Sequence, residues 1–188
     1  IDSFLNKEFY YPMGMTTTVY RPERRCRYMM RRIPPTEFDA VYRNRMVQGE
    51  VHDERAYYMG GVAGHAGLFS SGADLGRFAQ MLLWDGEYNG RQFIDSATVA
   101  EFTARRPEGY ALGFDLKSLE GFTTAGQMAS DATFGHLGFT GTSIWIDPER
   151  DLAVILLTNR TYPQRGSSAG INQVRNNVMD AVFESVDD

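Results

Sequence analysis

The apolar residues of three segments recur every three or four positions, which is the spacing of one face of a helix. In the first segment they are Ile1, Phe4, Leu5 and Phe9. In the second they are Leu75, Phe78, Ala79 and Leu82, and in the third Ile171, Val174, Val178 and Val182. We therefore predict a helix already under way at residue 1, a helix ending near residue 84, and a closing helix whose stripe suits docking on a sheet.

Capping residues mark the starts of two helices. Ser71 and Asp74 have the spacing of a capping box before the middle helix. Asp95 is placed to cap a further short helix, which we expect to bury Val99 and Phe102.

From residue 109 onward the pattern becomes that of strands. Residues 110–116 and 142–146 are predicted strands, and residues 152–157 form an apolar run typical of a strand buried on both faces. Asp147 to Arg150 have the sequence of a type I turn, so the last two strands should form an antiparallel hairpin. The predicted fold class is α+β, an antiparallel β-sheet flanked by helices.

The rest of the chain has no sustained period. Residues 16–56 are rich in arginine and hold the pair Pro34-Pro35, so we predict a long, partly ordered segment. Residues 60–67 form a glycine-rich loop around His65.

Composition excludes several classes. A net charge of −5 leaves no general basic surface for nucleic acid. No apolar run is long enough to span a membrane, and no signal peptide is recognisable. One cysteine, Cys26, cannot form an internal disulfide. Because the chain opens inside a helix without an initiator Met, we expect it to be the C-terminal piece of a longer protein.

The segment from Phe134 to Gly141 carries the candidate chemistry. It places the titratable imidazole of His136 beside two glycines at the start of a strand. Glycine admits the close approach of another backbone, which favours a ligand site. The alternative is a glycine-rich strand entry with a structural histidine.

Four segments carry a family resemblance: residues 12–15 (Pro-Met-Gly-Met), 51–54, 60–71 and 135–148. Together they resemble the C-terminal half of the serine β-lactamase-like superfamily, which includes class C β-lactamases, D-alanyl-D-alanine peptidases and related esterases. The resemblance covers nearly the whole chain. It implies that residues 1–188 are the C-terminal portion of a single β-lactamase-like domain.

The family uses three catalytic motifs, and this chain holds one of them. His136-Leu137-Gly138 fits the third, although Leu137 has no hydroxyl to offer a substrate carboxylate. The first, Ser-x-x-Lys, is absent, because the two lysines, at positions 7 and 117, each follow a phenylalanine three residues earlier. The sequence Tyr42-Arg43-Asn44 matches the pattern of the second motif, Tyr-x-Asn. It lies downstream of residues 12–15, whereas the family's second motif lies upstream, so we reject Tyr42 as catalytic.

The resemblance assigns roles around the third motif. The backbone N–H of Phe139 would be one donor of the oxyanion hole, and His136 would hold a polar group of the substrate, orient the missing Tyr or move a proton. Expected substrate contacts are Leu137, Gly138, Thr140 and, at the rim, His65. A zinc site from His52, Asp53, His65 and His136 lacks the usual ligand spacing, so neither metal nor cofactor is expected.

The resulting hypothesis is the C-terminal part of a serine hydrolase that cleaves an amide or ester through an acyl-enzyme. The substrate would be a β-lactam, a D-alanyl peptide or a simple ester, and the partner the missing N-terminal half of the domain, in the same chain or a separate one. The alternative is a non-catalytic module that binds peptidoglycan or a partner protein. The family resemblance implies that the protein acts in the periplasm or cell envelope.

Overall fold

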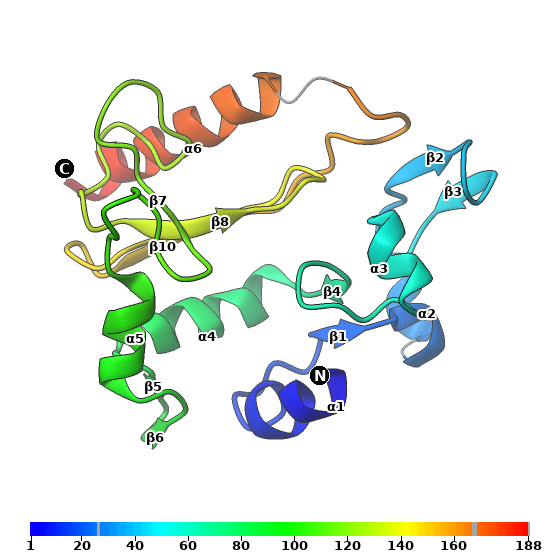
Figure 1. Cartoon of the computed structure of the whole chain (residues 1–188), viewed down its shortest axis with the longest axis horizontal. Coiled ribbons are helices and arrows are strands. Elements are labelled where there is room, and N and C mark those ends of the chain that lie inside the picture. Colours follow the sequence, from blue (N-terminus) through cyan, green and yellow to red (C-terminus); the bar gives the residue numbers. More distant parts are fainter. Residues whose placement is uncertain (26, 167–168, 188) are drawn as a thin grey trace. The chain divides into compact units, whose positions relative to one another are not determined.

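The computed structural model describes residues 1–25, 27–166 and 169–187, so Cys26 lies outside the described residues. The chain forms two compact units (Figure 1). The first comprises residues 1–75 and 159–166, and the second comprises the remaining residues. Helices and antiparallel sheets make up both units, which confirms the predicted α+β class.

The second unit is built on a four-stranded antiparallel sheet with the order β10-β9-β8-β7. Its strands are β7 (Asp115–Leu116), β8 (Phe134–Leu137), β9 (Ser143–Asp147) and β10 (Leu152–Leu156). The predicted hairpin is confirmed, since Leu152 pairs with Asp147 across the turn. The strand predicted over residues 110–116 is wrong in extent. Gly113 has a φ of 83°, which interrupts an extended backbone, and the strand begins at Asp115.

The prediction that the run 152–157 is a strand buried on both faces is also wrong for this chain. Within the described sheet β10 is an end strand that pairs with β9 alone. Val154 is buried, whereas its neighbours are only partly covered and Leu157 is exposed.

Helix α6 (Ala169–Asp187) covers one face of this sheet, as Figure 1 shows. The core between them is formed by Ala125, Ala129, Trp145, Val154, Met179 and Phe183. The docking of this helix was predicted correctly, and so was most of its buried stripe, since Ile171 is buried and Val178 and Val182 pack against the core. Val174 is 45% exposed, and the buried row runs through Ile171, Arg175, Met179 and Phe183 at intervals of four residues.

Two further helices belong wholly or mainly to the second unit, α4 (Gly72–Leu83) and α5 (Ser96–Thr103), together with the hairpin of β5 (Glu87–Tyr88) and β6 (Arg91–Gln92). The Ser71 half of the predicted capping box is present, because the Asp74 amide donates to Ser71 Oγ at 3.3 Å, and the Asp74 carboxylate accepts from the Thr17 amide at 2.8 Å. The predicted Asp95 cap is present, and its carboxylate accepts from the Ala97 amide at 3.0 Å. Val99 is buried as expected, but Phe102 is exposed.

The first unit consists of short elements. They are α1 (Asp2–Leu5), a π-helix (Asn6–Tyr10), β1 (Val19–Tyr20), α2 (Pro22–Arg25), a 3-10 helix (Arg27–Arg32), β2 (Glu37–Asp39), β3 (Arg45–Val47), α3 (Glu54–Tyr58) and β4 (Leu68–Phe69). β1 pairs with β4 and β2 with β3. The N-terminal helix is confirmed. The segment 16–56 holds short helices, turns and paired strands, in agreement with the partial order that was predicted.

Candidate active site

The turn between β8 and β9 is closed by backbone hydrogen bonds. The Gly138 amide donates to the Thr142 carbonyl at 2.8 Å, and the Gly141 amide donates to the Gly138 carbonyl at 3.0 Å. Gly141 has a φ of 120°, a conformation that favours glycine. The Thr158 hydroxyl donates to the Gly141 carbonyl at 2.8 Å and ties the turn to the chain after β10. The turn therefore has a fixed shape.

The two glycines beside His136 both have packing reasons. A Cβ at Gly135 would collide with the Ile144 carbonyl and the Trp145 ring, and one at Gly138 would collide with the Thr142 hydroxyl. Strand packing thus requires glycine at position 135 without any ligand, whereas a side chain at position 138 requires only that the Thr142 hydroxyl rotate away. The role of Gly138 in admitting substrate stays a prediction.

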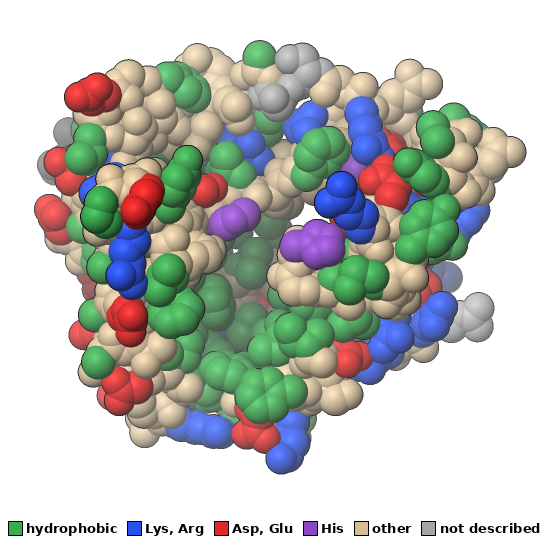
Figure 2. Space-filling view, viewed as in Figure 1, with side chains coloured by type: hydrophobic (Ala, Val, Ile, Leu, Met, Phe, Trp, Pro, Cys, Tyr) green, Lys and Arg blue, Asp and Glu red, His purple; other side chains and the backbone are tan. Residues whose placement is uncertain are grey.

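His136 is exposed on the sheet face opposite α6, because it alternates along β8 with Gly135, which pairs with Trp145. Histidine side chains are visible at the surface in Figure 2. The Nδ1 atom of His136 lies 2.9 Å from the Leu137 carbonyl oxygen. A carbonyl only accepts hydrogen bonds, so Nδ1 carries the proton. In the neutral ring Nε2 then keeps its lone pair for another partner.

The other predicted residues of this segment fall into two groups. Phe139 is 58% exposed and lies in the turn beyond the end of β8, and Thr140 is half-buried beside it. Leu137, by contrast, packs against the core under α6. The structure thus brings His136, Gly138, Phe139 and Thr140 together at one end of the sheet, while the Leu137 side chain serves the core.

Sequence reasoning missed Arg175, which contacts this turn from α6. Arg175 is 4% exposed, and its Nη2 atom donates to the carbonyls of Gly138 at 2.8 Å and Thr142 at 2.7 Å. The interval of four residues that joins Ile171, Arg175 and Met179 could have placed it on the buried face.

His65 belongs to the first unit, where it is exposed. Its Nε2 lies 3.0 Å from Asp53 Oδ1, and the same oxygen accepts the Ala56 amide at 2.8 Å as the N-cap of α3. The Ala56 amide and, after it, the His65 ring hold the pKa of Asp53 below its usual value, against the effect of burial. The expected position of His65 at the rim of the His136 site stays a prediction.

A second histidine of this unit adjoins a buried carboxylate. His52 Nε2 lies 3.1 Å from Glu37 Oε1, and Arg165 binds both oxygens of Glu37 and also Glu54. Burial opposes ionisation of Glu37, but Arg165 and His52 outweigh it and hold the pKa of that carboxyl below its ordinary value. Both His52 and Asp53 thus have structural partners.

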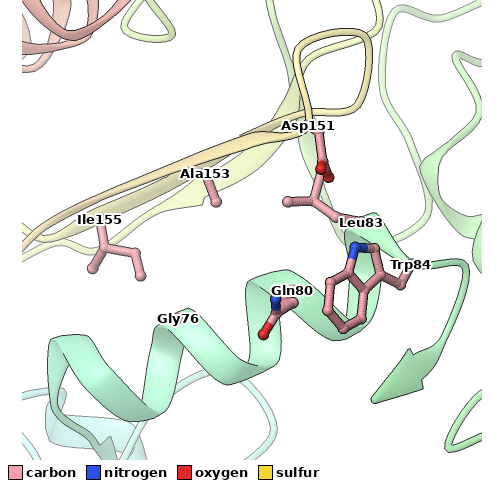
Figure 3. Close-up of a pocket in the computed structure, with 7 residues that line it drawn as sticks. All are labelled: Gly76, Gln80, Leu83, Trp84, Asp151, Ala153 and Ile155. Carbon is pink, nitrogen blue, oxygen red and sulfur yellow. The ribbon is translucent and has the colours of Figure 1, made fainter. Parts of the chain in front are cut away.

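Two of the hollows in the described part of the chain are not lined by the β8–β9 turn. One of about 320 Å³ lies between α4 and β10 (Figure 3), with Gln80, Trp84 and Ile155 among its lining residues. The other, of about 410 Å³, is lined by Pro34, Pro35, Asn159 and Tyr162. In the described ranges no three His, Cys, Asp or Glu side chains gather closely enough to hold a metal ion. None of the helices in that same part of the chain could cross a membrane.

Comparisons with known proteins identify the family to which this chain is related. The beta-lactamase family matches residues 1–175. A protein of Salmonella gallinarum named as a D-alanyl-D-alanine carboxypeptidase is 36% identical over an alignment of 181 residues, covering 86% of this chain and 40% of that protein. A beta-lactamase from Mycobacterium bovis shares the fold, with a TM-score of 0.63 and 23% identity over 98% of this chain and 56% of that one.

A penicillin-binding protein homologue from Caulobacter crescentus shares the fold as well, with a TM-score of 0.63 and 18% identity over 98% of this chain and 52% of that one. The chain therefore spans less than two thirds of the length of these proteins. The match over residues 1–175, together with the carboxypeptidase relative, shows that the chain belongs to the beta-lactamase family.

Proposed function

We propose that this chain forms the oxyanion-binding part of a serine hydrolase that works through an acyl-enzyme, with a D-alanyl peptide as substrate. The observation that carries the proposal is the β8–β9 turn. It holds the Phe139 peptide beyond the end of a strand, with the exposed imidazole of His136 three residues away. Such an arrangement suits a donor aimed at a carbonyl oxygen that becomes negative during attack.

In the proposed mechanism a serine from outside residues 1–188 attacks the substrate carbonyl carbon. The chain itself has no Ser-x-x-Lys, since its two lysines follow phenylalanines. The Phe139 N–H donates to the oxygen of the tetrahedral intermediate. The Nε2 lone pair of His136 accepts a proton or a hydrogen bond from a hydroxyl or amide group beside the bound substrate. The hollow for the substrate is completed by residues that this chain does not contain.

The name of the Salmonella relative supports the substrate class. At 36% identity, a protein named as a D-alanyl-D-alanine carboxypeptidase favours a D-alanyl peptide over a β-lactam or a simple ester. Both rivals go through the same acyl-enzyme chemistry, so they are natural comparison substrates.

The test uses the complete protein encoded by the reading frame that contains residues 1–188. Release of D-alanine from a D-alanyl-D-alanine peptide is measured, and the acyl-enzyme is sought by mass spectrometry. Phe139→Pro removes the N–H at the second position of a turn, where proline fits, and Phe139→Ala keeps it. We expect Phe139→Pro to lower the acylation rate by about 10²–10³-fold and Phe139→Ala to leave it nearly unchanged.

Two results would refute the proposal. One is a complete reading frame without any Ser-x-x-Lys, in which case the alternative of a non-catalytic module that binds peptidoglycan or a partner protein takes its place. The other is a complete protein that forms no acyl-enzyme with peptide, β-lactam or nitrophenyl ester. Equal acylation rates in Phe139→Pro and Phe139→Ala would remove Phe139 from the oxyanion hole.

A further inference from the structure

A buried guanidinium lies behind the turn that carries the proposed oxyanion donor. Arg175 projects from α6, and the two hydrogens of its Nη2 atom reach the carbonyls of Gly138 and Thr142 at 2.8 and 2.7 Å. Its Nη1 atom donates to Asn172 Oδ1, one turn earlier on the helix, at 2.9 Å. Helix α6 thus holds a positive charge against the backbone of the β8–β9 turn.

One of these two carbonyls belongs to the same peptide group as the Phe139 N–H. The Gly138 carbonyl and the Phe139 amide form one planar, conjugated unit. A cation bound at the oxygen draws electron density toward that end, which makes the N–H at the other end a stronger donor. The Gly138 carbonyl also accepts the Gly141 amide at 3.0 Å, so two donors fix the plane of this peptide.

We propose that Arg175 is a positioning residue for the oxyanion hole, which orients the peptide between Gly138 and Phe139 and strengthens its N–H as a donor. The inference rests on the proposed function. As negative charge develops on the substrate oxygen, the polarised peptide stabilises it more than it stabilises the neutral carbonyl of bound substrate. An interaction of that kind acts on the rate of acylation rather than on substrate binding.

The position of Arg175 also explains why a charged residue lies on the buried face of α6. Its neighbours in that row, Ile171, Met179 and Phe183, are apolar. A buried guanidinium is costly unless its donors are used, and here three of its five N–H groups make hydrogen bonds to oxygen atoms. Two of the three end on the turn that would bind the oxyanion.

The experiment compares Arg175→Met and Arg175→Lys in the complete protein. Arg150→Met is the matched control, because Arg150 is another arginine of the second unit that contacts α6, through the Phe183 ring, and binds Asp147 at the hairpin. For each variant kcat and KM are measured on the substrate that the wild type cleaves, and the melting temperature is recorded.

We expect Arg175→Met to lower kcat by about 10-fold or more and to change KM by less than about twofold. Arg175→Lys should fall between Met and the wild type, because an ammonium keeps the charge but loses the fixed fork of the guanidinium. Arg150→Met should lower the melting temperature while kcat stays at the wild-type value.

A kcat for folded Arg175→Met equal to that of Arg150→Met would overturn this inference and leave the proposed function standing. If Arg175→Met does not fold, Arg175→Lys tests the inference in its place. A wild-type kcat in that variant overturns the inference. A wild-type protein without any acyl-enzyme would instead refute the proposed function itself.

Discussion

At the scale of single residues, Gly135 shows how packing at the candidate site limits substitution. A Cβ at this position would collide with the Ile144 carbonyl and the Trp145 ring, and backbone cannot move aside as a flexible side chain can. We expect Gly135→Ala to lower the free energy of unfolding by about 1–3 kcal/mol, as overpacking does. Urea unfolding of the complete protein measures the change.

Gly76→Ala is the control for that experiment. Gly76 lies in α4, and a Cβ there meets nothing within 4 Å. Alanine is a better helix former, so this substitution should be neutral or stabilising by up to about 1 kcal/mol. If Gly135→Ala were equally harmless, the tight packing of Trp145 against β8 would be wrong.

Glu37 makes stability depend on pH. The pKa of this carboxyl lies below its ordinary value of 4.5 in the folded chain, because Arg165 and His52 outweigh the effect of burial. The unfolded chain therefore binds a proton more readily. The stabilisation is complete above about pH 4.5 and is lost as the pH falls through the lower, folded pKa.

We expect Glu37→Gln to cost about 1–3 kcal/mol at pH 7 and progressively less as the pH falls below 4.5. Urea unfolding at a series of pH values measures this difference. Glu50→Gln, which breaks the more exposed ion pair with Arg45, is the control and should cost less than about 1 kcal/mol. If the free energies of unfolding of the wild type and Glu37→Gln differed by the same amount at every pH, the expected pH dependence would be contradicted.

At the scale of elements, the buried face of α6 can be tested directly. Phe183 is fully buried in the core on the sheet, and Val174 is 45% exposed. Phe183→Ala should therefore cost about 3–5 kcal/mol, whereas Val174→Ala should cost less than about 1 kcal/mol. Thermal or urea unfolding distinguishes them, and similar losses would place Val174 on the docking face as well.

The elements that could be predicted are those whose signal is local. The helix after Ser71, the Asp95 cap and the hairpin through Asp147 each depend on residues a few positions apart. The face of α6 was predicted except for Val174, which satisfies the same period as Val178 and Val182 but is exposed, whereas those two valines pack against the core. Arg175 was missed for a related reason: an arginine on a helix is normally solvated, and its partners Gly138 and Thr142 are more than thirty residues away in sequence.

The candidate site, too, could be predicted from the sequence only in part. The local pattern of glycines and apolar residues pointed to the His-Leu-Gly motif but placed it at the start of a strand. His136 and Leu137 instead end a separate strand, β8, which was not predicted from the sequence. The packing reasons for those glycines depend on Trp145 and Thr142, which only the pairing of β8 with β9 brings near. The side chain of Leu137 likewise turned out to face the core, since the alternation along β8 depends on where α6 docks.

At the scale of the whole molecule, β10 bears on how residues 1–188 behave alone. Within the described sheet this strand pairs on one side only, and Ala153 and Ile155 line the open hollow toward α4 (Figure 3). An apolar end strand with unpaired backbone groups is a template for another strand. The polypeptide of residues 1–188 should therefore self-associate as its concentration rises, unless another strand covers β10.

Sedimentation equilibrium of residues 1–188 over a range of concentrations tests this expectation. Ile155→Lys should weaken association, because a charge on an end strand opposes pairing with a second strand. Val174→Lys adds the same charge to the exposed face of α6, so it should leave association unchanged if β10 is the contact. A polypeptide that stays monomeric at every concentration and unfolds in one sharp transition would show that the end strand needs no partner. Equal weakening by both lysines would point to general charge repulsion rather than to pairing at β10.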